Sequence, residues 1–253
     1  MATSVRVQLK VLGQPIDAEV PMPPATVRLD AVLPLLRRLD DKAVDLAVAK
    51  TEAETGERVS CSKGCSACCR SQPVPVTPPE AYALWLLVSE LPEPRQAEIR
   101  GRFAANVTAL SEAGFIDRYL ERPRTLRADD AEPLARAYFA LGLDCPFLSN
   151  HACSIYSERP FVCRQYLVMS PVAMCANPFD EPVRVVPTAV RFAHAMLETG
   201  EAFLKVSQET IPLALALEYV DRHKAELEQM FPAEAVFRDA IARLTTLSAN
   251  AME

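Results

Sequence analysis

The chain has 253 residues, of which 50% are hydrophobic and 24% charged, and its formal net charge is −6. Such a length can bury a hydrophobic core without disulfide staples, and the composition is typical of a soluble globular protein. The negative charge gives no electrostatic reason to expect nucleic acid or an anionic membrane surface as a partner. The N-terminus lacks the apolar block of a signal peptide, and the longest apolar run, residues 81–88, is too short to span a bilayer. These features together predict a cytoplasmic protein.

The first 57 residues predict a β-hairpin and a long helix. Apolar residues alternate with polar ones from Val5 to Val11, which is the period of a half-buried strand. A short extended piece around residues 19–20 is expected to pair with this strand. After a proline-rich link, Asp30 is expected to cap a helix that Gly56 ends. The helical period is carried by Val32, Leu36, Leu39, Ala43 and Leu46.

The middle of the chain predicts further helices. Thr77, the two prolines after it and Glu80 form a capping-box pattern, and the apolar run that follows predicts a largely buried helix. Residues 94–113 and 131–141 are also expected to be helical. The cysteine-bearing stretch 145–175 predicts loops that contain one short helix.

Ser157 is expected to cap that short helix. Beyond it, three helical segments are expected at 188–206, 211–230 and 233–247. They contain no cysteine, and we interpret them as a scaffold or a partner surface. The fold class is therefore expected to be mainly α with a small N-terminal β-hairpin and a loop-rich cysteine core packed on helices. One compact unit with three parts is expected; the parts are residues 1–57, 58–176 and 177–253.

All eight cysteines fall into two groups. The first is Cys61, Cys65, Cys68 and Cys69, and the second is Cys145, Cys153, Cys163 and Cys175. Cytosolic thiols are held reduced, so clustered cysteines there bind metal or perform redox chemistry more often than they form disulfides. Free cysteine is also among the most buried residue types, and burial as a small hydrophobe is the alternative for Cys175. All eight are candidate metal ligands.

The first group has the spacing C-x3-C-x2-C-C. Spacings of two and three residues let a tight turn direct two sulfurs to one zinc ion, and similar runs hold iron–sulfur clusters. Gly64 suits such a turn. Because adjacent cysteines point in different directions, Cys68 and Cys69 are expected to serve different metals, unless one of them stays free. Eight thiolates can form two four-sulfur sites, or one cluster with spare thiols.

Positive charges near the cysteines are expected to offset the charge of the thiolates. They are Lys63, Arg70, Arg159 and Arg164. Cys163 is expected to lie early in the short helix, where the helix dipole would favour its thiolate.

Other side chains give weaker signals. His151 is interpreted as a loop residue rather than a ligand, His194 as a core histidine and His223 as part of a solvated face. Asp144 and Glu158 are the carboxylates considered for an acid–base pair, although nothing in the sequence brings them together. The chain contains no motif of a serine nucleophile, zinc protease, phosphate loop or dinucleotide site.

The runs 61-CSKGCSACC-69, 145-CPFL-148 and 153-CSIYSERPFVCRQY-166 resemble the YkgJ-like cysteine-cluster family, the putative zinc- or iron-chelating CxxCxxCC domain. The similarity covers roughly residues 58–176, with x3 in place of x2 between the first two cysteines. It implies metal chelation by these cysteines. Flagellin lysine N-methylases are similar in this domain, which implies a link to protein methylation and favours an iron–sulfur cluster over zinc. The other matched positions are Tyr156, Glu158, Arg159, Arg164 and Tyr166.

The C-x3-C-x2-C spacing also resembles the cluster motif of radical S-adenosylmethionine enzymes. Those enzymes use a β/α barrel and glycine-rich segments, whereas this chain has seven glycines and no alternating strand–helix pattern after the motif. The sequence therefore predicts a protein that binds a metal ion, as an iron–sulfur cluster or as zinc, in a redox or structural role. The alternative is an S-adenosylmethionine-dependent protein lysine methyltransferase. Neither nucleic acid nor membrane is expected as a partner, and the sequence leaves a protein partner and enzymatic activity open.

Overall fold

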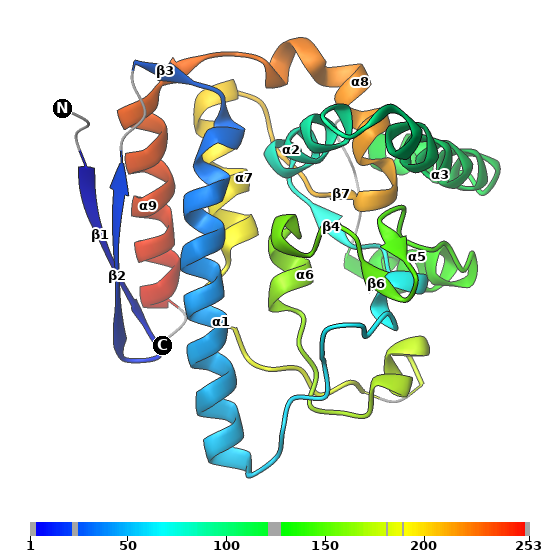
Figure 1. The fold of residues 1–253 in the computed structure, drawn as a ribbon, viewed down its shortest axis with the longest axis horizontal. Helices are drawn as coiled ribbons and strands as arrows, with labels where there is room; N and C mark the ends of the chain where they lie inside the picture. Colours follow the sequence, from blue (N-terminus) through cyan, green and yellow to red (C-terminus); the bar gives the residue numbers. More distant parts are fainter. Residues whose placement is uncertain (1–3, 22–24, 121–127, 181, 189, 251–253) are drawn as a thin grey trace.

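A computed structural model describes residues 4–21, 25–120, 128–180, 182–188 and 190–250 of the protein. The fold is mainly α-helical with a small N-terminal β-hairpin, as the sequence predicts (Figure 1). No helix in these ranges is long and apolar enough to cross a membrane.

The hairpin consists of β1 (Ser4–Val11) and β2 (Gln14–Pro21), which pair in antiparallel register from Ser4 with Pro21 to Val11 with Gln14. The turn residues Leu12 and Gly13 have positive φ angles of 51° and 83°, as a two-residue type I′ turn requires. The second strand is longer than the piece expected at residues 19–20. The buried side chains of the hairpin are Val7, Leu9, Val11 and Ile16.

The long helix α1 (Leu33–Thr55) follows a 3-10 turn, η1 (Leu29–Val32), and ends at Gly56 with a φ of 70°. The predicted end of the helix is thereby confirmed. The predicted cap at Asp30 is wrong, because Asp30 lies inside η1 and accepts a hydrogen bond of 3.0 Å from Arg28 Nε. The residue that precedes α1 makes no side-chain capping bond.

Two helices from the C-terminal third complete a first hydrophobic core. The helices α7 (Phe192–Leu204) and α9 (Ala233–Asn250) pack beside α1, and the hairpin lies against α1 and α9 (Figure 1). The short strand β3 (Thr26–Val27) pairs with β8 (Phe231–Pro232) and joins the start of α1 to the start of α9.

A second hydrophobic core lies on the other side of the molecule. Its helices are α2 (Pro78–Ser89), α3 (Glu93–Glu112), α4 (Ile116–Leu120), α5 (Ala128–Ala140) and α8 (Ala216–Leu227), the last preceded by the 3-10 turn η5 (Leu213–Leu215). The predicted capping box of α2 is confirmed, since Glu80 N donates to Thr77 Oγ1 at 3.3 Å and Thr77 N donates to Glu80 Oε2 at 2.9 Å. The strand β4 (Pro75–Val76) pairs with β7 (Ile211–Pro212).

The short helix α6 (Phe161–Gln165) lies between the two cores (Figure 1). Phe161 belongs to the first core, whereas Phe147 and Ile155 from the preceding loops belong to the second. The predicted cap at Ser157 is wrong, because Ser157 lies in a separate 3-10 turn, η3 (Tyr156–Glu158). The cysteine-bearing loops are thus held at the junction of the two cores.

Candidate metal centre

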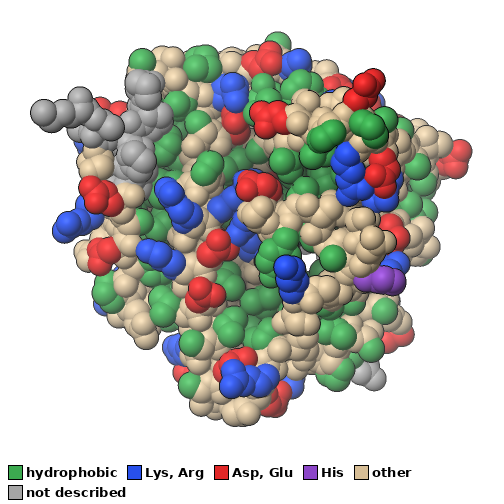
Figure 2. All heavy atoms as spheres, viewed as in Figure 1, with side chains coloured by type: hydrophobic (Ala, Val, Ile, Leu, Met, Phe, Trp, Pro, Cys, Tyr) green, Lys and Arg blue, Asp and Glu red, His purple; other side chains and the backbone are tan. Residues whose placement is uncertain are grey.

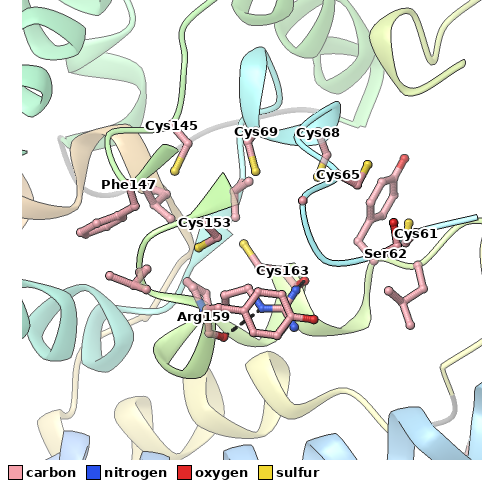
Figure 3. Close-up of a pocket in the computed structure, with 18 residues that line it drawn as sticks. Cys61, Ser62, Cys65, Cys68, Cys69, Cys145, Phe147, Cys153, Arg159 and Cys163 are labelled. Atoms are coloured by element: carbon pink, nitrogen blue, oxygen red, sulfur yellow. Dashed lines mark hydrogen bonds between the residues drawn. The ribbon is translucent and has the colours of Figure 1, made fainter. Parts of the chain in front are cut away.

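Seven of the eight cysteines line one pocket beside α6, with a cavity volume of about 90 Å³. Figure 2 shows the hollow in this face of the molecule, and Figure 3 shows the thiols around it. The lining cysteines are Cys61, Cys65, Cys68, Cys69, Cys145, Cys153 and Cys163. Cys175 lies outside this lining, buried in the 3-10 turn η4 (Val172–Ala176). The structure therefore brings both predicted groups of cysteines together.

The loop that carries the first group is folded by local turns. Gly64 has a φ of 95°, which an L-residue rarely adopts, and Cys65 N donates to Ser62 O at 3.0 Å. Cys69 N donates to Ser66 O at 3.0 Å, and a 3-10 turn, η2 (Cys68–Arg70), follows. The expected tight turn at Gly64 is confirmed.

A distant backbone segment holds the start of the same loop. Ser60 N donates to Val168 O at 2.8 Å, and Val168 N donates to Cys61 Sγ at 3.3 Å. The sulfur of Cys61 thus already accepts a hydrogen bond from a backbone amide, a contact that also favours a thiolate.

The second group is positioned by a two-residue hairpin. The strands β5 (Leu148–Ser149) and β6 (Ala152–Cys153) pair so that Cys153 faces Leu148. Cys145 N donates to Cys69 O at 2.7 Å, which joins the first cysteine loop directly to the second. This single backbone bond brings together segments that are 76 residues apart, from 69 to 145.

The helix that carries Cys163 is anchored by buried polar groups. Phe161 N donates to Glu80 Oε1 at 2.8 Å, so the cap of α6 comes from the first turn of α2. The buried guanidinium of Arg164 donates to Arg159 O at 2.8 Å and to the Asp41 carboxylate. Gln165 Nε2 donates to Asp40 Oδ1 at 2.8 Å. Arg164 therefore fixes α6 against α1 and does not line the pocket, contrary to its expected role beside the thiols.

Burial keeps most of these thiols protonated in the metal-free protein. Burial raises the pKa of Cys145 to about 12 and that of Cys175 to about 11. Burial also raises the pKa of Cys163, and the neighbouring thiols of Cys145, Cys68 and Cys153 raise it further. The expectation that a helix dipole favours the Cys163 thiolate is wrong, because desolvation outweighs the dipole of a five-residue helix.

Four cations were expected to offset thiolate charge, and of these Arg159 lines the pocket. Its guanidinium lies 3.8 Å from the ring centroid of Tyr156 and donates to Cys163 O at 3.3 Å. Burial raises the pKa of Cys61 and of Cys153, and the Arg159 charge opposes that rise at both thiols. Arg159 is thus positioned to compensate thiolate charge.

The chemistry of the donor set fits a thiophilic metal. The residues that line the pocket include seven thiols and no carboxylate or imidazole, and thiolates select zinc, copper(I) or iron–sulfur clusters. In their present rotamers, no three His, Cys, Asp or Glu side chains of the described ranges are arranged to hold one ion. The thiols surround a shared cavity without closing on a point.

The remaining matched or considered residues have structural contacts. His151 Nδ1 and Arg70 lie 2.9 Å apart outside the pocket, as expected of a loop residue. The acid–base pair that was considered does not form, because Asp144 pairs with Arg70 and Glu158 pairs with Arg37.

The two other histidines differ from their interpretations. His194 is not a core residue, since 49% of its side chain is exposed and its Nε2 lies 3.2 Å from Glu198. His223 is only partly solvated, because its ring lies 4.4 Å from the Tyr219 ring. Neither lines the cysteine pocket.

Sequence reasoning missed the part that Glu80 plays at the site. The capping-box pattern identified its contacts within α2, but its second oxygen caps α6 across 81 residues of sequence. Local patterns carry no signal for such a bond. The sequence does place an acid at the third position of an apolar helix. Such a carboxylate is buried, and a buried carboxylate requires more than one hydrogen-bond donor.

Comparisons with known proteins agree with this geometry. Residues 60–180 match the family model CxxCxxCC, described as a putative zinc- or iron-chelating domain. Searches of curated proteins and of solved structures returned no match. The matched range contains all eight cysteines and α6. Residues 60–180 are therefore similar to the CxxCxxCC putative zinc- or iron-chelating domain.

Proposed function

We propose that the protein binds a metal centre through its clustered cysteine thiolates, as an iron–sulfur cluster in preference to zinc. The main support for this proposal is that seven thiols, without a carboxylate or imidazole, line one cavity. A bound cluster would supply one-electron redox chemistry, whereas zinc would supply a structural crosslink. The eight cysteines would be the ligands, and Arg159 would offset part of their negative charge.

The apolar wall of the pocket supports the iron–sulfur alternative. Val74, Phe147 and Leu213 line it together with the thiols. Such a wall limits access of water, and exposure to solvent is one of the factors that set the reduction potential of a cluster. Zinc needs no such shell.

The volume of the cavity separates an inorganic centre from an organic cofactor. At about 90 Å³ it is well below the roughly 300–1,000 Å³ of pockets that hold drug-sized molecules. S-adenosylmethionine would not fit among the thiols. The methyltransferase alternative therefore depends on a neighbouring pocket of about 290 Å³, which shares Cys68, Cys163 and Tyr166 with the first.

Metal analysis of protein purified without oxygen tests the proposed function. We expect iron and sulfide in stoichiometric amounts and a broad visible absorption band near roughly 400 nm. Zinc in place of iron would retain thiolate chelation and exclude the cluster. Protein without stoichiometric metal would overturn the proposal. The variant Ser66→Ala, in the same loop but outside the pocket lining, should retain the wild-type metal content.

Thermal denaturation with S-adenosylmethionine tests the alternative function. A ligand that binds only the folded state raises the midpoint with its concentration. An unchanged midpoint at millimolar concentration of the cofactor would exclude the methyltransferase, whatever metal the protein holds.

A further inference from the structure

We infer that the eight cysteines form two separate four-thiolate sites, which meet at the adjacent pair Cys68 and Cys69. The first site consists of Cys61, Cys65, Cys68 and Cys175, and the second of Cys69, Cys145, Cys153 and Cys163. Each site would hold one thiophilic metal ion or one cluster of such ions. The inference rests on the proposed function and adds the number of centres and the ligands of each.

The thiols are already sorted in space. Figure 3 shows the sulfurs of Cys69, Cys145, Cys153 and Cys163 around the same part of the pocket. The sulfurs of Cys61, Cys65 and Cys68 lie on the other side of the same view. The division does not follow the sequence groups, because Cys69 lies with three cysteines of the second group.

Backbone contacts support this sorting. Cys145 N donates to Cys69 O at 2.7 Å, and Cys153 lies across a two-residue hairpin from Leu148, whose N–H donates to Cys145 O at 2.9 Å. The three residues Cys69, Cys145 and Cys153 are therefore held by consecutive backbone bonds.

Cys175 lies with the first site. Its turn, η4, packs against η2, which carries both Cys68 and Cys69. Because Cys69 lies with Cys145, Cys153 and Cys163 in Figure 3, Cys68 is the member of the pair that we assign to the same site as Cys175.

The local geometry of Cys68 and Cys69 explains how one loop serves two sites. A 3-10 turn has three residues per turn, so consecutive side chains leave it about 120° apart. Both residues lie in η2. One metal ion takes four thiolates, and so does one four-iron cluster. Eight thiols sorted four and four therefore match two centres, whereas one centre would leave four buried or half-buried thiols unused.

Metal content of paired variants of the full chain, purified without oxygen, tests the inference. We expect Cys61→Ser and Cys153→Ser each to retain half of the wild-type metal per chain. The double variant across the sites, Cys61→Ser with Cys153→Ser, should retain none. The double variant within one site, Cys145→Ser with Cys153→Ser, should retain the same half as Cys153→Ser alone.

Three outcomes would overturn the inference. Loss of all metal from each single variant would show that the two cysteines serve one shared site. Retention of half of the wild-type metal by the cross-site double variant would also place Cys61 and Cys153 in one site. A single metal centre in the wild-type protein would also overturn the inference, but it would leave the proposed function intact. Wild-type protein without metal would instead remove the proposed function itself. If Cys61→Ser fails to fold, as judged by circular dichroism, Cys65→Ser from the same site replaces it.

Discussion

At the scale of single residues, Glu80 positions the candidate metal centre although it lies outside it. The side chain is almost fully buried and accepts from Thr77 N, Thr77 Oγ1 and Phe161 N. Burial raises the pKa of Glu80, and the Thr77 and Phe161 amides oppose that rise. Its two oxygens thereby join the first turn of α2 to the helix that carries Cys163.

The variant Glu80→Gln should destabilise the protein and loosen α6. A glutamine has one acceptor oxygen, so it cannot accept from the Thr77 and Phe161 amides through separate oxygens. One buried N–H loses its partner, at a cost of about 1–3 kcal/mol in the free energy of unfolding. Urea denaturation measures this cost. Glu90→Gln, at the exposed end of α2, is the control and should lie within about 0.5 kcal/mol of wild type. Equal stability of the two variants would contradict the role of Glu80.

The raised thiol pKa values give metal binding a defined dependence on pH. Burial raises the pKa of Cys145 to about 12 and of Cys175 to about 11, so these thiols hold their protons at neutral pH. Each must lose its proton to bind a metal, and affinity therefore rises with pH. We expect about a tenfold gain in zinc affinity per pH unit for each proton released between pH 6 and 8. A competitive titration against a zinc indicator measures it, and a pH-independent affinity would argue against thiol ligands.

At the scale of secondary-structure elements, α6 is held to α1 by a buried carboxylate. Asp40 is fully buried in α1, and its Oδ1 accepts from Gln165 of α6. Its Oδ2 has no hydrogen-bond partner in the part of the chain that the structure describes. Burial raises the pKa of Asp40 well above that of a free aspartate, to about 7.

The sign of the resulting pH dependence follows from proton binding. Between pH 4 and 7 the folded state holds a proton on Asp40 that the unfolded state has lost, so stability falls as pH rises through this window. The fall is on the order of 4 kcal/mol at most. The variant Asp40→Asn is neutral at every pH, and its Oδ1 can still accept from Gln165.

We therefore expect the stability of Asp40→Asn relative to wild type to rise by about 2–3 kcal/mol from pH 5 to pH 8. Urea denaturation at the two pH values measures this. Asp45→Asn, at an exposed position of the same helix, should leave the wild-type pH slope unchanged. A wild-type slope in Asp40→Asn would show that another group carries the pH dependence.

Elements that depend on local sequence were predictable, and those that depend on tertiary contacts were not. The alternation from Val5 to Val11 and the capping box of Thr77 and Glu80 are confirmed, because each acts within a few residues. The caps expected at Asp30 and Ser157 are wrong. Asp30 accepts a hydrogen bond from Arg28 instead, and Glu80 from another helix caps α6 in place of Ser157.

The candidate site shows the same division. The number and close spacing of the thiols predicted a metal centre, and seven of them do line one pocket. The bond between Cys145 N and Cys69 O was not predictable, since no local pattern relates residues so far apart. His194 was misplaced because the sequence could not show which face of α7 meets the first core.

At the scale of the whole molecule, the candidate centre lies where the two hydrophobic cores meet. Cys145 and Cys153 pack against the second core, and Phe161, two residues before Cys163, is buried in the first. A metal that binds thiols from both sides would crosslink the two halves of the fold. Metal binding is then linked to folding of the complete chain.

Removal of the metal should therefore lower the thermal midpoint of the whole protein. At a metal concentration of 1,000 Kd the linkage is about 4 kcal/mol, which corresponds to about 10 °C for a chain of this size. Differential scanning calorimetry before and after chelation measures the change. Protein carried through the same procedure without chelator is the control, and identical midpoints would contradict the crosslink.

X-ray absorption spectroscopy at the metal edge of the purified protein tests most directly whether the cysteines are the ligands. We expect a first shell of sulfur alone, at about 2.3 Å from each metal, with four sulfurs per ion. Nitrogen or oxygen scatterers at about 2.0–2.2 Å as the main first shell would contradict thiolate chelation, because the pocket offers no imidazole or carboxylate ligand.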